Sequence, residues 1–143
     1  MRISTRSRYG LKVMYELALK YGGEPVFLKE IARIHRISEK YLSKLVIPLR
    51  GVGLILSHRG AHGGYTLARA PGSVTVMDIV RVLEGDFSPA SRTRKTRGTD
   101  GNDEQPTEDV WVTLEKAINQ TLGAITLESL VQAGRSQVPN YQI

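Results

Sequence analysis

The side chains best suited to chemistry in this sequence are cations and hydroxyls on the outer face of one predicted helix. Lys40, Ser43 and Lys44 recur at helical spacing, which places them side by side on a helix that begins at Ser38. Lysine can donate to O6 and N7 of guanine, and serine can donate or accept, so this face can hydrogen-bond to base edges in a DNA major groove. Taken alone, such a face also fits ordinary solvated charge.

A second candidate group lies in a glycine-rich turn between two short β-prone runs at 54–57 and 65–67. Arg59 starts the turn, and small residues follow it as far as Gly64. An arginine at such a tip suits the narrow, strongly negative minor groove of DNA, and the small residues let the backbone approach closely. An ordinary hairpin turn is the alternative. The turn is not a P-loop, because no Gly-Lys-Ser/Thr follows.

Further cations and a tyrosine lie near the N-terminus and at the end of the predicted helix that begins at Ser38. Such side chains bond phosphate oxygens, which sets the register and affinity of binding but not its sequence preference. The candidate phosphate contacts are Arg2, Arg6, Arg8, Tyr9 and Arg50.

Three predicted helices position these groups. Apolar residues at helical spacing predict a helix over 5–21, with Tyr21 on its apolar face, and a second helix over 28–36. The third begins at Ser38, a good N-cap, contains Pro48, which removes one backbone hydrogen bond, and is ended by glycines. Its core-facing residues are Leu42, Leu45, Val46 and Leu49.

The order helix, helix, tight turn, helix and hairpin is typical of a winged helix-turn-helix. A fourth helix opens at Thr75, which can form a capping box with Asp78, and closes at Gly85. The fold class we expect is mainly α, with a small β-hairpin wing and a long C-terminal dimerisation helix. The predicted apolar face of the fourth helix comprises Val76, Ile79, Val80 and Leu83.

The C-terminal half has a different pattern. Residues 86–107 carry almost no apolar side chain beyond Phe87, which predicts a mobile loop. A long helix follows from Glu108, and a short segment at 126–131 adds further leucines. The apolar residues of the long helix form a narrow seam of the kind used between two helices. They are Trp111, Leu114, Ile118, Leu122 and Ile125.

These patterns predict four parts of the chain. We expect a winged helix DNA-binding domain over 1–85, a mobile loop over 86–107, dimerisation helices over 108–132 and a flexible tail over 133–143.

Charge and composition narrow the function classes. The 143 residues carry 20 Lys and Arg against 14 Asp and Glu, a net charge of +6, and residues 1–70 alone carry 13 against 4, a net charge of +9. This asymmetry predicts an anionic partner for the N-terminal half. The absence of cysteine excludes a disulfide, a thiol nucleophile and an iron–sulfur cluster held by this chain's own thiolates. No apolar run is long enough to span a membrane, so we expect a soluble, cytoplasmic protein.

The three histidines could suggest a metal site or catalysis. His35 falls on the buried face of its predicted helix, whereas His58 and His62 flank the glycine-rich turn. No cysteine or clustered carboxylate completes a metal shell, so we expect no metal and no cofactor. Catalysis needs titratable groups that converge in a pocket, which the sequence does not predict. We therefore expect that the chain is not an enzyme.

Several segments together resemble the Rrf-two family of bacterial winged helix-turn-helix transcription regulators. They are residues 1–11, 37–42, 49–54, the wing at 59–65, which is the most specific, and 125–127. The resemblance implies a sequence-specific homodimer on a roughly palindromic operator, in which the long helix crosses its counterpart, and a role as repressor. It adds Ser38 and Tyr41 to the base-reading residues, Gly60 and His62 to the minor-groove contacts of the wing, and Thr5 to the phosphate contacts.

The family has branches with different controls. The iron–sulfur branch carries three cysteines in the loop after the fourth helix, and this chain has none. Segments 45–50, 79–85 and 88–89 are similar instead to the CymR-like branch of cysteine-metabolism repressors, which lack the cluster ligands and are controlled by a complex with cysteine synthase. The resemblance therefore implies control by a partner protein or small ligand.

The final residues bear on that partner. Cysteine synthase captures partners that end in isoleucine, and Ile143 with Tyr141 is a possible docking segment, although a frayed polar terminus is the alternative. A second function hypothesis follows: a protein-interaction module whose main role is to hold such an enzyme, and which would tolerate the loss of Arg59.

Overall fold

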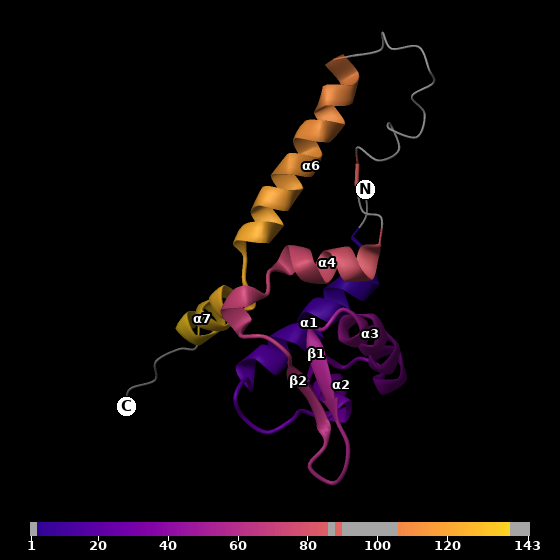
Figure 1. Cartoon of the computed structure of the whole chain (residues 1–143), viewed down its shortest axis with the longest axis vertical. Helices are drawn as coiled ribbons and strands as arrows, with labels where there is room; N and C mark the ends of the chain where they lie inside the picture. The colour runs from indigo at the N-terminus through magenta and orange to yellow at the C-terminus, as the bar shows by residue number, and fades with distance from the viewer. Residues whose placement is uncertain (1–2, 86–87, 90–105, 138–143) are drawn as a thin grey trace.

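The computed structural model describes residues 3–85, 88–89 and 106–137. A long helix, α6, extends away from a body that the other helices and a hairpin form (Figure 1). The observed order confirms the expected winged helix-turn-helix with a long C-terminal helix. The elements are α1 (Thr5–Leu19), α2 (Leu28–His35), α3 (Glu39–Gly51), β1 (Ile55–His58), β2 (Gly64–Leu67), the 3-10 helix η1 (Pro71–Ser73), α4 (Val76–Glu84), α6 (Pro106–Ala124) and α7 (Leu127–Gln137).

Helix α1 supplies the central face of the core. Ser4 caps it, because its hydroxyl accepts a hydrogen bond from the Ser7 amide. The helix ends at Leu19, before the predicted end at residue 21, because the Lys20 amide turns back to the carbonyl of Leu17. Tyr21, predicted on the apolar face, lies beyond the helix and is 51% exposed. The buried apolar residues of α1 are Val13, Met14, Leu17 and Ala18.

Helices α2 and α3 form the helix-turn-helix. Helix α2 ends at His35, one residue before the predicted end, because Arg36 adopts the left-handed conformation with φ 55°. The tight turn then leads to Ser38, whose hydroxyl accepts the Tyr41 amide at 3.3 Å and caps α3 as predicted. The four residues predicted to face the core from α3 are each 3% exposed or less, which confirms that face: Leu42, Leu45, Val46 and Leu49.

The wing is a two-stranded antiparallel hairpin. Its register pairs Ile55 with Leu67 at the base and His58 with Gly64 at the tip. Ile55 and Leu67 are buried, whereas the strand residues nearer the tip are half-buried or exposed. The hairpin is therefore anchored in the core at one end and projects from the body at the other (Figure 1).

Helix α4 returns the chain to the core and confirms the predicted cap. The Thr75 amide donates to Asp78 at 2.9 Å, and the Asp78 amide donates to the Thr75 hydroxyl at 3.1 Å. Gly85 ends the helix with φ 69°. The predicted apolar face is buried throughout: Val76, Ile79, Val80 and Leu83.

The C-terminal helices differ from the prediction in their bounds. Helix α6 begins at Pro106, where the sequence predicts loop, and it ends at Ala124. Ile125, predicted as the last seam residue, lies outside the helix because its carbonyl accepts the Val76 amide at 2.9 Å and ties it to the start of α4. Helix α7 runs to Gln137 and so includes residues 133–137, predicted as tail.

Helix α7 packs into the core, whereas α6 lies against α4 without entering the core. Leu127 and Val131 of α7 belong to the same hydrophobic core as α1, α3 and α4, whereas no described residue of α6 is buried. No described helix is long and apolar enough to cross a bilayer.

Candidate nucleic-acid interface

The outer face of α3 carries the predicted base-reading cations. Lys40, Ser43 and Lys44 are all exposed, on the side of the helix opposite its core-facing leucines. The Ser43 hydroxyl donates to the backbone carbonyl of Glu39 at 2.9 Å, which leaves its oxygen free to accept. The structure therefore presents two ammonium groups and a hydroxyl acceptor on one rigid helical face.

Ser38 and Tyr41, the other predicted base-reading residues, have structural contacts. The Ser38 hydroxyl accepts the Tyr41 amide as the cap of α3. The Tyr41 ring is half-buried and meets the Tyr9 ring edge to face, with centroids 5.7 Å apart. Tyr41 thus joins α3 to α1, a contact that the local sequence pattern did not indicate.

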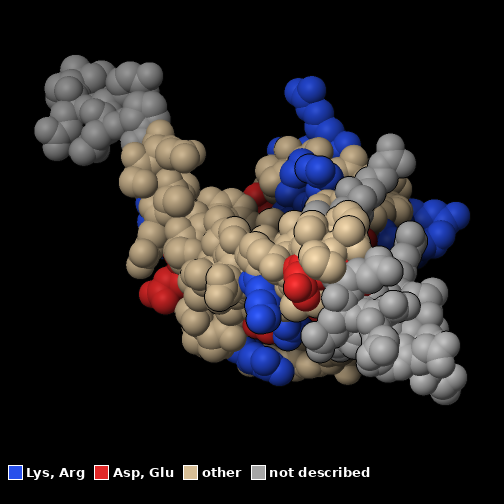
Figure 2. Space-filling model, turned by 90° about the horizontal axis from the view of Figure 1, so that it is seen from above, with Lys and Arg blue, Asp and Glu red and all other residues tan. Residues whose placement is uncertain are grey.

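Predicted phosphate contacts surround the start of α1 and the end of α3. Thr5, Arg6, Arg8 and Arg50 are exposed, and Arg2 lies outside the described residues. Lys and Arg side chains project from the body in several directions when the molecule is seen from above (Figure 2).

Tyr9 differs from these exposed candidates. Besides its contact with Tyr41, its ring lies 5.6 Å from the ammonium of Lys12, which places a further cation beside the α1–α3 junction. Lys12 was missed at the sequence level, because its helical position alone does not separate it from a solvated lysine.

The tip of the wing exposes its candidate minor-groove residues. Arg59, Gly60 and His62 are exposed, and Gly60 has φ +101°, a conformation that favours glycine. The Gly63 amide closes the turn on the Gly60 carbonyl at 3.0 Å. The predicted hairpin turn is therefore confirmed, and it presents Arg59 on a short, closed tip.

A bridge to the segment before α2 fixes the wing. Val26 and Tyr65 exchange two backbone hydrogen bonds, at 2.9 and 2.8 Å. Beside them, Gly64 has φ +127°, and a Cβ there would lie 2.6 Å from the Val26 carbonyl oxygen. Only glycine allows this approach, so the sequence determines where the wing meets the body.

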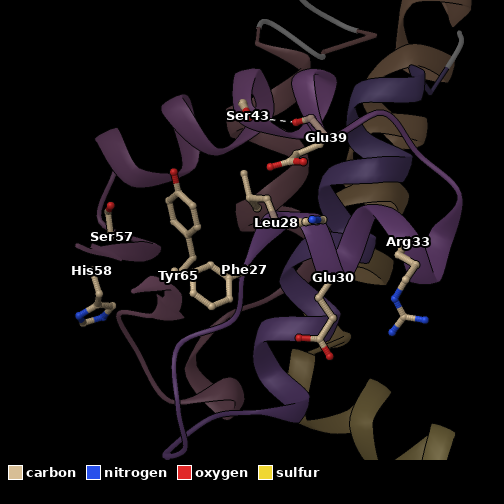
Figure 3. A pocket seen from close by; sticks show the side chains of 11 residues that line it. Phe27, Leu28, Glu30, Arg33, Glu39, Ser43, Ser57, His58 and Tyr65 are labelled. Atoms are coloured by element: carbon tan, nitrogen blue, oxygen red, sulfur yellow. Dashed lines mark hydrogen bonds between the residues drawn. The ribbon is translucent and has the colours of Figure 1, made fainter. Parts of the chain in front are cut away.

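A groove of about 770 Å³ lies between the wing on one side and residues 27–33 and the start of α3 on the other. Phe27 and Tyr65 form an aromatic wall, and Ser57 and His58 line the side of β1 (Figure 3). Ser43 lines the groove from α3, so the groove joins the two elements predicted to enter DNA.

The groove also contains charged residues that the sequence analysis did not single out as sites. Lys29 and Arg33 come from α2, with Glu30 beside them, and Glu39 comes from the first turn of α3. Glu39 is not among the base-reading residues predicted from the sequence. Its position in the first turn of α3, beside Lys40, was the signal that could have identified it as a candidate reader.

The predicted dimerisation seam lies on the exposed helix α6. Trp111 is 44% exposed, and the neighbouring Val110 and Val112 are exposed as well. Leu114, Ile118 and Leu122 are half-buried along the same helix. The valines flank the predicted seam, one on each side of Trp111. The possible docking residues Tyr141 and Ile143 lie outside the described residues.

Comparison with known proteins extends these observations. A family model described as "Rrf2: Iron-dependent Transcriptional regulator" matches residues 3–133. The helix-turn-helix-type transcriptional regulator CymR of Bacillus subtilis is 45% identical over 131 residues, which cover 91% of this chain and 89% of that protein. The regulator IscR of Klebsiella pneumoniae is 34% identical, with 92% and 80% of the two chains covered.

Two solved structures have the same architecture. The structure of CymR, titled as the global cysteine regulator of B. subtilis, has a TM-score of 0.79 at 42% identity and covers 93% of this chain and 98% of its own. The structure of T. potens IscR has a TM-score of 0.80 at 37% identity and covers 96% and 92%.

The iron in the family description does not match the donors of this chain. The sequence contains no cysteine, the residue whose thiolate holds iron–sulfur clusters. Within residues 3–85, 88–89 and 106–137, no group of three or more His, Asp or Glu side chains is placed to hold a metal ion. The residues present do not fit a cluster held by this chain's own thiolates.

Proposed function

Because the chain belongs to the Rrf2 family of transcriptional regulators, we propose that it is a dimeric, sequence-specific repressor that binds a roughly palindromic operator. Helix α3 enters the major groove, and the tip of the wing enters the adjacent minor groove. The observation that carries the proposal is the exposed face of Lys40, Ser43 and Lys44 on a helix whose opposite face is fully packed. A packed helix holds these donors in a fixed register on the bases.

The protein groove beside α3 and the wing can accommodate the DNA backbone strand that runs between the major and the minor groove. Lys29, Ser57 and His58 line it and can donate to phosphate oxygens. Glu39 faces the same space and can accept a hydrogen bond from N4 of cytosine, which adds it to the proposed base readers. Its carboxylate also repels a misplaced phosphate, which favours one register.

The start of α1 and the end of α3 supply the remaining backbone contacts. Thr5, Arg6 and Arg8 are exposed on the first turn of α1, and Arg50 is exposed at the end of α3. Contacts of this kind contribute affinity to all sequences alike.

A second copy of the chain completes the proposed assembly. Val110, Trp111 and Val112 expose apolar surface near the start of α6, a helix with no buried residue among those described. A helix pair related by a two-fold axis buries such a surface and places two α3 helices on a palindrome.

Control by a partner protein or a small ligand fits this chain better than control by a cluster, since it has no thiolate. The 45% identity to CymR, a relative whose structure is titled as a global cysteine regulator, supports a role in cysteine or sulfur metabolism. The alternative, a module that mainly holds a metabolic enzyme such as cysteine synthase, keeps enzyme binding when Arg59 is replaced.

Binding to genomic fragments over a range of salt concentrations tests the proposal. The proposed regulator enriches a few fragments that share a palindrome, and its affinity falls by about 10³-fold or more between 50 and 200 mM salt. Equal binding of all fragments would contradict it. An Arg59→Ala variant that loses DNA but retains an enzyme partner separates the two functions in one experiment.

A further inference from the structure

The first turn of α1 is held by Glu84, at the C-terminal end of α4. The Oε1 atom of Glu84, the last residue of α4, accepts hydrogen bonds from the Ser4 amide at 2.8 Å, the Ser4 hydroxyl at 2.5 Å and the Ser7 hydroxyl at 2.5 Å. Ser4 and Glu84 are 80 residues apart in sequence. The N-cap of α1 is therefore itself bound by α4.

Packing next to this contact fixes how the two helices meet. Ser7 is 2% exposed, so its hydroxyl is satisfied inside the protein and not by bulk water. One turn further on, a Cβ on Gly10 would lie 2.1 Å from Cδ1 of Leu83, so α1 and α4 approach closely at this glycine. The hydrogen bonds and the close approach together define the position of the first turn of α1.

The positive charge of the first turn of α1 favours a carboxylate at the position of Glu84. The first turn of α1 contains no acidic residue and carries Arg6 and Arg8, although a helix N-terminus favours negative charge. Burial tends to raise the pKa of Glu84, but hydrogen bonds from Ser4 and Ser7 and the charge of Arg6 outweigh it, so this pKa lies below its ordinary value. Glu84 is ionised at neutral pH and supplies the negative charge that α1 lacks.

We propose that Glu84 is a positioning residue for DNA binding, which acts through Ser4 and Ser7 to hold Thr5, Arg6 and Arg8 against the DNA backbone. The inference rests on the proposed function. These side chains leave the same turn that Glu84 fixes, so a loosened turn loses phosphate contacts while the base-reading face of α3 stays in place.

The test compares Glu84→Gln with Asp78→Asn in the full chain. Both changes remove one negative charge from α4, and Asp78 caps the opposite end of that helix. Removing a negative charge alone should strengthen binding to DNA. We expect Glu84→Gln instead to weaken operator binding about tenfold and to lower the salt slope by about 1 to 2, because each lost phosphate contact removes about 0.9 from that slope.

Two controls keep the result interpretable. Asp78→Asn should bind at least as tightly as the wild type, and Glu84→Gln should keep the wild-type ratio of operator to random affinity. Ser7→Ala removes one of the three donors and should shift the salt slope in the same direction, which covers the case in which Glu84→Gln folds poorly.

The overturning results are distinct from those for the proposed function. If Glu84→Gln and Ser7→Ala bind like Asp78→Asn, with an unchanged salt slope, Glu84 does not position the DNA contacts. If the wild type shows no preference for any sequence, the proposed function fails, whatever the variants do.

Discussion

The Tyr9 ring on α1 meets the Tyr41 ring on α3 edge to face, with centroids 5.7 Å apart and planes at 86°. This contact fastens the recognition helix to the helix that carries the proposed phosphate contacts. Tyr41 is also predicted to read bases, so it has two candidate roles, packing through its ring and contact with DNA through its hydroxyl, which can be separated by experiment.

Replacing Tyr41 by phenylalanine separates packing from base reading. Phenylalanine retains the edge-to-face pair, so Tyr41→Phe should keep both stability and operator preference if the ring acts by packing. Tyr41→Ala should lower the free energy of unfolding by about 2 kcal/mol, below the range for a fully buried aromatic because the ring is half-buried. Urea unfolding and operator titration measure the two effects. A loss of operator preference in Tyr41→Phe would instead assign base reading to the hydroxyl.

The cations of α3 should differ in what they contribute. Lys40→Ala and Lys44→Ala should each cost about 1 to 3 kcal/mol of discrimination, because each removes a donor to a base edge. Arg50→Ala should weaken operator and random DNA alike and lower the salt slope by about 1. Competition binding with both DNAs measures the difference. Uniform weakening by all three changes would show that α3 contacts only the backbone.

The wing should depend on Gly64. Gly64→Ala places a methyl group 2.6 Å from the Val26 carbonyl oxygen and strains a backbone at φ +127°. We therefore expect the free energy of unfolding to fall by about 1 to 3 kcal/mol and operator binding to weaken. Gly51→Ala is the matched control, because it lies in α3 with nothing within 4 Å of the added Cβ. Because Gly51 is the last residue of α3, this change should leave stability unchanged or raise it slightly. Equal thermal unfolding of the two variants would contradict this account of the wing.

Glu84 should make stability depend on pH in the acid range. Its pKa is lowered in the folded state, so its contribution is present above the pKa of the unfolded chain and is lost as the pH falls through the folded value. We expect the loss to begin near the ordinary glutamate value of about 4.3. Urea unfolding from pH 7 to pH 3 should show a smaller acid loss in Glu84→Gln than in the wild type. Parallel curves would mean that the carboxylate contributes nothing specific.

The exposed face of α6 should hold the dimer together. Trp111→Glu places a charge in the apolar surface and should convert the chain to a monomer in sedimentation experiments, with a large loss of operator affinity. Gln120→Glu adds the same charge on the opposite side of α6, since nine residues turn an α-helix by two and a half turns. This variant should stay dimeric. A dimer that survives Trp111→Glu would place the interface elsewhere.

Local patterns predicted the parts of the fold that depend on local physics. The leucine face of α3, the Ser38 cap and the Thr75–Asp78 capping box all rest on residues within a few positions of one another. The wing followed from a change of period and a run of glycines. Each of these features is decided by backbone hydrogen bonds and side-chain spacing that can be read along the chain.

Contacts between distant segments were not predictable in the same way. Nothing near Glu84 in sequence indicates Ser4 as its partner, and nothing near Tyr41 indicates Tyr9. The seam was extended to Ile125 because its spacing continues the helix, whereas a backbone bond from Val76 draws this residue out of it. Tertiary hydrogen bonds override local spacing at such places.

Selection of bound duplexes from a randomised pool tests the central claim, that α3 and the wing read a palindrome, most directly. The account predicts enriched sequences with two-fold symmetry, half-sites separated by about one helical turn of 10 to 10.5 base pairs or a multiple of it, and an A·T preference where the wing lies. Lys40→Ala combined with Lys44→Ala should relax the half-sites and leave their spacing unchanged. A pool that stays random after selection with the wild-type protein would contradict the account.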